Sequence, residues 1–199
     1  MSTEQPTAED PKARTKGVGR SPFWVWTERA VWVFVAVMVF QRFGPQLGAA
    51  VGVGSDLGTM PSFQVTTLDG EVIHSDDLRG KVVLVNFWAT WCGPCRVEMP
   101  GFQRVFDDWE AEGFVLLGLT TDRVEESVVR AWLEERDLDY PVARSTAEIE
   151  QAFGGLRGLP TSFLVDRDGQ IRNRVYGFFA PPALRLAVRN LVRSETEMD

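Results

Sequence analysis

Two cysteines separated by a glycine and a proline are the residues of this chain with the clearest chemistry. They are Cys92 and Cys95, the only cysteines among 199 residues. They follow the apolar run Lys81–Trp88, which predicts a strand buried on both faces, and they precede a pattern typical of an amphipathic helix. A thiolate at a helix N-terminus is stabilised by the helix dipole and by unsatisfied backbone N–H groups. We therefore expect Cys92 to be an acidified nucleophile and Cys95, one turn later, to attack a mixed disulfide formed at Cys92.

The pair has two other interpretations, a metal site and a static disulfide. A metal site needs two further soft ligands, but the chain has no other cysteine and a single histidine, His74. A static disulfide across two intervening residues closes too small a loop to stabilise a fold much. A Cys-x-x-Cys pair between a strand and a helix is instead typical of redox chemistry. The sequence predicts a redox-active disulfide, with no metal and no cofactor.

The elements that must position the pair alternate between strand and helix patterns. They are expected at Phe63–Val65 and Val72–Ile73 (a hairpin), Lys81–Trp88 (strand), Cys95–Glu112 (helix), Phe114–Leu119 (strand), Asp122 to about Arg136 (helix), Tyr140–Ala143 (extended), around Ile149 and Phe153 (short helix), Thr161–Val165 and Ile171–Tyr176 (a second hairpin), and from Pro181 onward (helix). The helix from Asp122 is expected to start with a capping box of Asp122 and Glu125, and the short helix with Ser145 and Glu148. This order predicts an α/β fold around a mixed sheet.

The segment before this domain contains the one long apolar run, Ala30–Phe40. Extended to Phe23–Phe43 it has 21 residues, enough to span a bilayer core of about 30 Å, and Gly44-Pro45 ends it. A single transmembrane anchor is the preferred interpretation. A cleaved signal peptide with Gly48–Ala50 as its cleavage site, and a buried helix of a soluble protein, remain alternatives.

Charge and composition divide the chain in the same place. Residues 1–22 form a polar, basic tail, which by the positive-inside rule lies in the cytoplasm and places the rest outside it. Residues 44–59 are Gly-rich and are typical of a flexible tether, and residues 60–199 form the folded domain. Composition is that of a globular protein, with 44% hydrophobic and 25% charged residues. The net charge of −7 argues against nucleic acid as the main partner.

The segment Val83–Pro100 (VLVNFWATWCGPCRVEMP) resembles the thioredoxin superfamily, and more narrowly the TlpA/ResA-like, membrane-tethered extracytoplasmic thioredoxins. Pro100 falls where this superfamily kinks its active-site helix. Gly158–Thr161 matches the loop whose cis-proline faces the disulfide, and Asp122–Phe153 matches the strand-and-helix insertion of the TlpA-like branch. The resemblance implies a thioredoxin fold over Met60–Val192 with an N-terminal hairpin.

The same resemblance assigns roles to residues around the pair. It makes Cys92 and Cys95 the catalytic, redox-active disulfide, and Leu159 and Pro160 the residues that contact substrate; Trp91 is expected to form an apolar rim for docking. Thioredoxins carry a buried Asp six residues before the first cysteine, where this chain has Asn86, which cannot titrate.

Glu98 matches the acidic residue of the ResA-like branch and is expected to handle protons as a third catalytic group. A carboxylate partly buried beside thiols has a reason to be proton-poised. The alternative is a solvated helix glutamate.

The function implied is reduction of disulfides in protein substrates. The family includes cytochrome c maturation reductases, and its members are bacterial inner-membrane, single-pass proteins with a periplasmic domain. A membrane-embedded thiol carrier is the implied electron donor. Three alternatives stay open: an oxidant of the same fold, a copper-delivery module, which would need a wider cysteine spacing and a downstream histidine, and a peroxiredoxin-type peroxidase. The peroxidase would need Pro and Thr where the chain has Val85 and Ala89.

Overall fold

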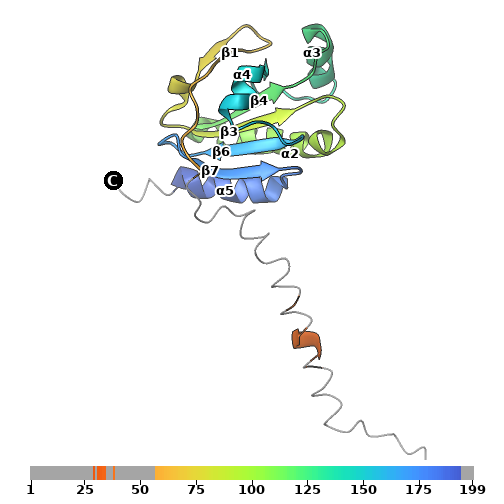
Figure 1. The fold of residues 1–199 in the computed structure, drawn as a ribbon, viewed down its shortest axis with the longest axis vertical. Coiled ribbons are helices and arrows are strands. Elements are labelled where there is room, and N and C mark those ends of the chain that lie inside the picture. The colour runs from red at the N-terminus through yellow and green to blue at the C-terminus, as the bar shows by residue number, and fades with distance from the viewer. Residues whose placement is uncertain (1–28, 30, 35–37, 39–56, 194–199) are drawn as a thin grey trace, which may run out of the picture. The chain divides into compact units, whose positions relative to one another are not determined.

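The structure, a computed structural model, describes residues 29, 31–34, 38 and 57–193. The chain falls into two units, Met1–Gly44 and Pro45–Asp199, and the elements labelled in Figure 1 belong to the second. Within the described residues, no helix combines the length and the apolar character that a membrane span requires. Most of the predicted anchor, Phe23–Phe43, lies outside the described residues, as do the tail 1–22 and nearly all of the tether.

A five-stranded mixed sheet with the order β5-β4-β3-β6-β7 forms the centre of the domain (Figure 1). Its strands are β3 (Val82–Trp88), β4 (Phe114–Thr120), β5 (Val142–Arg144), β6 (Thr161–Val165) and β7 (Ile171–Tyr176). The three strands β3, β4 and β5 are parallel, whereas β6 is antiparallel to β3 and to β7. The α/β fold predicted from the sequence, with its mixed sheet flanked by helices, is confirmed.

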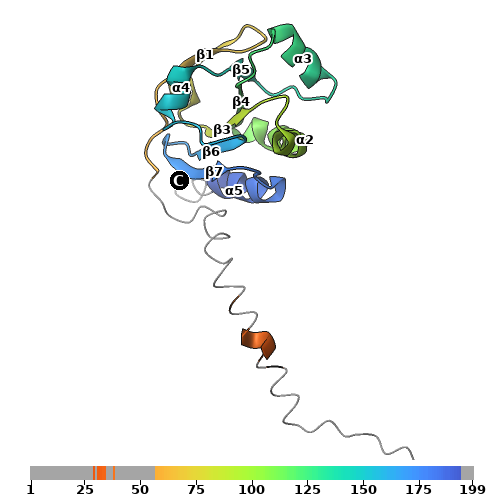
Figure 2. The ribbon, with the colours of Figure 1, turned by 45° about the vertical axis from the view of Figure 1, so that its right-hand side comes forward.

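The two faces of the sheet are covered by different elements. On one face lie α2 (Gly93–Trp109), α3 (Glu126–Glu134) and α5 (Pro181–Arg193). The other face carries α4 (Ala147–Ala152) and the separate antiparallel hairpin of β1 (Gln64–Thr66) and β2 (Val72–His74). Two short 3-10 turns, Ser75–Leu78 and Glu110–Glu112, lead into β3 and β4. Helices α2 and α5 lie side by side in both ribbon views (Figures 1 and 2).

The central strand β3 explains why the apolar run is continuous. Its side chains alternate between the faces, so that Val82, Leu84 and Trp88 pack with α2 and α5, and the odd-numbered residues pack with the hairpin and α4. Every residue of β3 is buried. Asn86 is the one polar residue of the strand, and by this alternation it lies on the α2 face.

Two predicted helix starts are wrong. The helix α3 begins at Glu126, and its N-cap residue Glu125 makes no side-chain cap. Asp122 is instead buried and hydrogen-bonded to threonines before the helix begins. The helix α4 is capped by Thr146, whose hydroxyl accepts from Ile149 N at 3.3 Å, because the preceding Ser145 is tied through its N–H to the end of β4.

Candidate active site

The cysteines lie where β3 passes into α2. A turn closed by the hydrogen bond from Cys92 N to Ala89 O (3.1 Å) brings Cys92 to the N-cap of α2. Cys92 and Cys95 form a disulfide, and Cys92 Sγ accepts from Cys95 N at 3.3 Å. Pro94 stands in the first turn, where its missing N–H costs no helical hydrogen bond. Cys92 is therefore the sulfur at the helix terminus, and Cys95, which is 0% exposed, lies beneath it.

Glu98 lies one turn beyond Cys95 on the same helix and is fully buried. Its Oε1 accepts from Asn86 Nδ2 at 3.2 Å, and its Oε2 accepts from Phe179 N at 2.8 Å. Burial raises the pKa of Glu98 from 4.5 to about 7, against the hydrogen bonds from Phe179 N and Asn86, which lower it. Glu98 is therefore no solvated helix glutamate, and its charge changes near neutral pH.

Asn86 links this carboxylate to the sheet. It pairs in register with Ser162 of β6, and its Nδ2 also donates to Ser162 Oγ at 3.0 Å. Its Oδ1 is buried and has no hydrogen-bond partner among the described residues. The hydroxyl of the buried Tyr140 also has no hydrogen-bond partner among the described residues. Burial raises the pKa of Tyr140 above its usual range, and the charge of Glu98 raises it further.

The three residues predicted to contact substrate, Trp91, Leu159 and Pro160, differ in exposure. Trp91, next to Cys92, is 70% exposed. The Leu159–Pro160 peptide bond is cis, as the resemblance implied, and Pro160 O accepts from Gly177 N at 2.8 Å. Leu159 is half-buried and packs against the core cluster that contains both cysteines. Trp91 thus offers an exposed indole next to Cys92 in the chain, Leu159 is partly covered by the core, and the contact of these residues with substrate stays a prediction.

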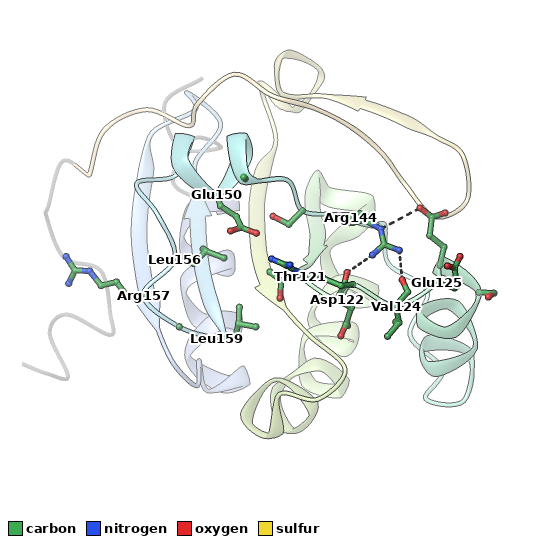
Figure 3. A pocket seen from close by; sticks show the side chains of 15 residues that line it. Thr121, Asp122, Val124, Glu125, Arg144, Glu150, Leu156, Arg157 and Leu159 are labelled. Atoms are coloured by element: carbon green, nitrogen blue, oxygen red, sulfur yellow. Dashed lines mark hydrogen bonds and ion pairs between the residues drawn. The ribbon is translucent and has the colours of Figure 1, made fainter.

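A polar cleft of about 1050 Å³ opens beside this loop (Figure 3). Its walls come from three segments, residues 121–127, 144–150 and 156–159. Arg144 points toward the first wall and donates to the backbone oxygens of Asp122 and Val124. Sequence reasoning missed this cleft and the buried position of Asp122, although a polar residue at the carboxyl end of a strand beside β3 is a signal that points there. No cluster of three or more metal-ligating side chains occurs in the part of the chain that the structure describes.

A family model described as AhpC/TSA matches residues 58–174. The chain belongs to the AhpC/TSA family. A thiol-disulfide oxidoreductase ResA of Bacillus cereus is 37% identical over 117 residues, covering 59% of this chain and 67% of that protein. The thioredoxin-like protein YneN of Bacillus subtilis (strain 168) is 34% identical over 114 residues, covering 57% and 66%.

The fold has similar solved structures as well. The crystal structure of a thiol:disulfide interchange protein of the thioredoxin family from Chlorobium tepidum TLS aligns with a TM-score of 0.64 and 32% identity, covering 70% of this chain and 99% of that one. The expected likeness to TlpA/ResA-like thioredoxins is thereby confirmed, and so are the thioredoxin-like fold and the thiol-disulfide oxidoreductase class.

Proposed function

We propose that this AhpC/TSA-family chain reduces disulfides of protein substrates outside the cytoplasm, with Cys92 as the attacking thiol and Cys95 as the resolving thiol. The observation that carries the proposal is the difference between the two sulfurs. Both cysteines are buried, Cys92 at 4% and Cys95 at 0% exposed. Cys92 caps α2 and its sulfur accepts from the backbone N–H of Cys95, whereas Cys95 lies inside the first turn of the helix. A thiolate is stabilised at the first position and a protected thiol at the second.

The reaction exchanges two electrons between dithiol and disulfide. In the reduced protein the Cys92 thiolate attacks one sulfur of the substrate disulfide, forms a mixed disulfide and releases the other substrate sulfur as a thiolate. Cys95, once its proton has left, attacks Cys92 Sγ and releases the second substrate sulfur. The substrate ends as a dithiol and the protein as the Cys92–Cys95 disulfide seen in the structure.

Glu98 is proposed to manage the proton that Cys95 must lose. Asn86 cannot take it, and Glu98 shares a helix face with Cys95 at a spacing of three residues. A base with a pKa near the working pH combines a useful ionised fraction with a useful basicity, which fits the value of about 7 for Glu98. The N–H of Phe179 and the amide of Asn86 hold the carboxylate in place.

The reducing direction is supported by the Gly-Pro pair between the cysteines, which resembles reducing members of the superfamily. A membrane-embedded thiol carrier would supply the electrons, and apocytochrome c is a substrate that the likeness to cytochrome c maturation reductases suggests. Measurement of the reduction potential of Cys92–Cys95 tests the direction: a value well above that of the glutathione pool indicates an oxidant. A peroxidase is disfavoured, because Val85 and Ala89 stand where its Pro and Thr are needed.

The single-pass anchor Phe23–Phe43 is part of the proposal, with the domain on the periplasmic side of a bacterial inner membrane. Its support is the apolar run Ala30–Phe40, which lies within a 21-residue segment long enough to span a bilayer core. The full-length protein should then fractionate with membranes, and protease added to spheroplasts should remove the domain beyond about Gly44. A mature N-terminus near Val51 in the soluble periplasmic fraction would favour a cleaved leader.

Trapping experiments test the assignment of the two thiols. Only Cys92 is expected to react quickly with iodoacetamide in the reduced protein near neutral pH, because only its sulfur lies at the helix terminus. Cys95→Ser should accumulate mixed disulfides with substrate proteins, and Cys92→Ser should accumulate none. Equal alkylation of both thiols, or trapping by the Cys92 variant, would contradict the proposed roles.

A further inference from the structure

The turn that presents Cys92 is held by Asp122, which follows the neighbouring strand β4. Thr90, in the middle of this turn, donates twice to Asp122: its backbone N–H to Oδ2 at 2.8 Å and its hydroxyl to Oδ1 at 3.0 Å. Each carboxylate oxygen thus binds one donor of the same residue. Hydrogen bonds to a charged acceptor are about twice as strong as neutral ones, so this pair ties the turn to the end of β4.

Asp122 is itself built into the fold. It is 4% exposed, its Oδ2 also accepts from Thr120 Oγ1 at 2.9 Å, and its backbone N donates back to that hydroxyl at 3.2 Å. Arg144 holds the same segment by donating to the backbone oxygens of Asp122 and Val124 (Figure 3). No side-chain cation pairs with the Asp122 carboxylate among the described residues. The carboxylate therefore acts as the hydrogen-bond acceptor for Thr90 and Thr120.

We propose that Asp122 is a positioning residue that fixes the Cys92 sulfur at the N-terminus of α2 through its two hydrogen bonds to Thr90. On the β3 side, the turn is also closed by the bond from Cys92 N–H to Ala89 O. None of the Asp122 contacts involves a sulfur atom, so breaking the disulfide does not itself remove any of them. Without these hydrogen bonds the turn is more mobile. The Cys92 thiolate is then less often close to the backbone N–H of Cys95 and to the helix N-terminus, the two features that stabilise it.

The inference rests on the proposed function, because it assigns a part in presenting the attacking thiol. It is tested without any substrate, by the rate at which iodoacetamide alkylates Cys92 in the reduced full-length protein between pH 5 and 9. If wild-type protein fails to reduce protein disulfides, the proposed function fails. The comparison of variants by alkylation remains valid in that case.

Thr90→Val keeps the size of the side chain and the backbone hydrogen bond but removes the hydroxyl bond to Asp122. It should raise the pKa of the Cys92 thiol and slow alkylation near pH 6.5 by about two- to fivefold, the size of one helix-terminus interaction. Thr90→Ser keeps the hydroxyl and should restore the wild-type rate. In the Asp122→Ala background, Thr90→Val should add no further slowing, because Asp122 supplies the acceptors of both Thr90 bonds and the pair acts as one unit.

Thr121→Val is the matched control. Thr121 is also half-buried, lies beside Asp122, and its hydroxyl donates to Trp88 O at 3.3 Å rather than to the turn. It should cost similar stability in urea unfolding and leave the alkylation profile unchanged. A Thr90→Val profile that overlays the wild type, or equal slowing by Thr121→Val, overturns the proposal. Full slowing by Thr90→Val in the Asp122→Ala background would also overturn it.

Discussion

Replacement of Glu98 by glutamine isolates the one buried carboxylate of α2 whose charge changes near neutrality. Gln keeps the size of the side chain and an oxygen for Phe179 N. Its amide N–H₂ would face the amide of Asn86. A 180° turn of Asn86 would bring Oδ1, which has no partner among the described residues, to this N–H₂, and the Ser162 hydroxyl would then donate to Oδ1 instead of accepting from Nδ2. The variant should therefore fold, and it removes charge and proton exchange together.

The stability effect follows from the raised pKa of Glu98. Below pH 4.5 the carboxyl is protonated in both the folded and the unfolded chain, so it contributes no pH dependence. As pH rises from 4.5 to about 7, the unfolded chain ionises first, and the folded protein loses about 3 kcal/mol of stability, the equivalent of the pKa difference. Glu98→Gln lacks this loss. The difference in free energy of unfolding, variant minus wild type, should therefore be larger at pH 8 than at pH 5.

Glu98→Gln should gain stability at high pH, but it should lose catalytic rate. Cys95 and Glu98 are both 0% exposed, so water is a poor substitute for the carboxylate, and loss of general acid–base help costs about 10²-fold. Protein disulfide reduction by Glu98→Gln should fall by this factor and lose the step near pH 7. Removal of the negative charge should also lower the pKa of the Cys95 thiol.

The assay combines reduction rates from pH 5 to 9, cysteine titration, and urea unfolding at pH 5 and pH 8. Glu112→Gln, the same change at an exposed position, is the control and should overlay the wild type throughout. Asn86→Ala should cost about 1–3 kcal/mol of stability through loss of a buried hydrogen-bonding group. It should keep the pH step and move it upward, because the Asn86 bond lowers the pKa of Glu98. A Glu98→Gln rate profile identical to wild type would refute the proton-handling role.

Two further changes test the packing around the site. An added Cβ at Gly101 would lie 2.2 Å from Pro181 Cγ, so Gly101→Ala should destabilise the fold by about 1–3 kcal/mol in urea unfolding. Gly93→Ala is the comparison, because an added Cβ there would have nothing within 4 Å. Equal effects of the two substitutions would show that α5 shifts to make room for the methyl group. Tyr140→Phe removes a buried hydroxyl without a partner among the described residues, so the free energy of unfolding should stay within about 1 kcal/mol of wild type; a larger loss would show that the hydroxyl is satisfied.

Much of the fold was predictable because its signals are local. The continuous apolar run predicted β3, and the bounds of β6 and β7 match the expected hairpin residue for residue. Asn86 and Glu98 were each singled out separately, and the contact between them follows from period 2 along β3. Asn86 lies an even number of residues from Leu84 and Trp88, whose side chains pack against α2. Its side chain is therefore expected on the same face of the strand, toward this helix.

The remaining contacts depend on tertiary partners that no local pattern contains. Asp122 and Glu125 have the spacing of a capping box. The Asp122 carboxylate is instead occupied by three other donors, the N–H and hydroxyl of Thr90 and the hydroxyl of Thr120. The partner of Glu98 Oε2 is the backbone N–H of Phe179, 81 residues away. Every residue except proline has a backbone N–H, so the residue type at position 179 does not reveal this donor. Its position next to Glu98 depends on the path of the chain between β7 and α5.

The two buried carboxylates beside the cysteines illustrate how surroundings divide one chemical group between two tasks. Asp122 accepts three hydrogen bonds, all within 3.0 Å, from threonines at the ends of β3 and β4. Glu98 accepts two, one of them at 3.2 Å, within an apolar helix–sheet interface. Hydrogen-bond donors on both oxygens suit a carboxylate that must hold a turn in place, whereas the desolvation that raises the pKa of Glu98 suits one that must exchange a proton. Interchange of the two environments, rather than of the two residues, is what would exchange their roles.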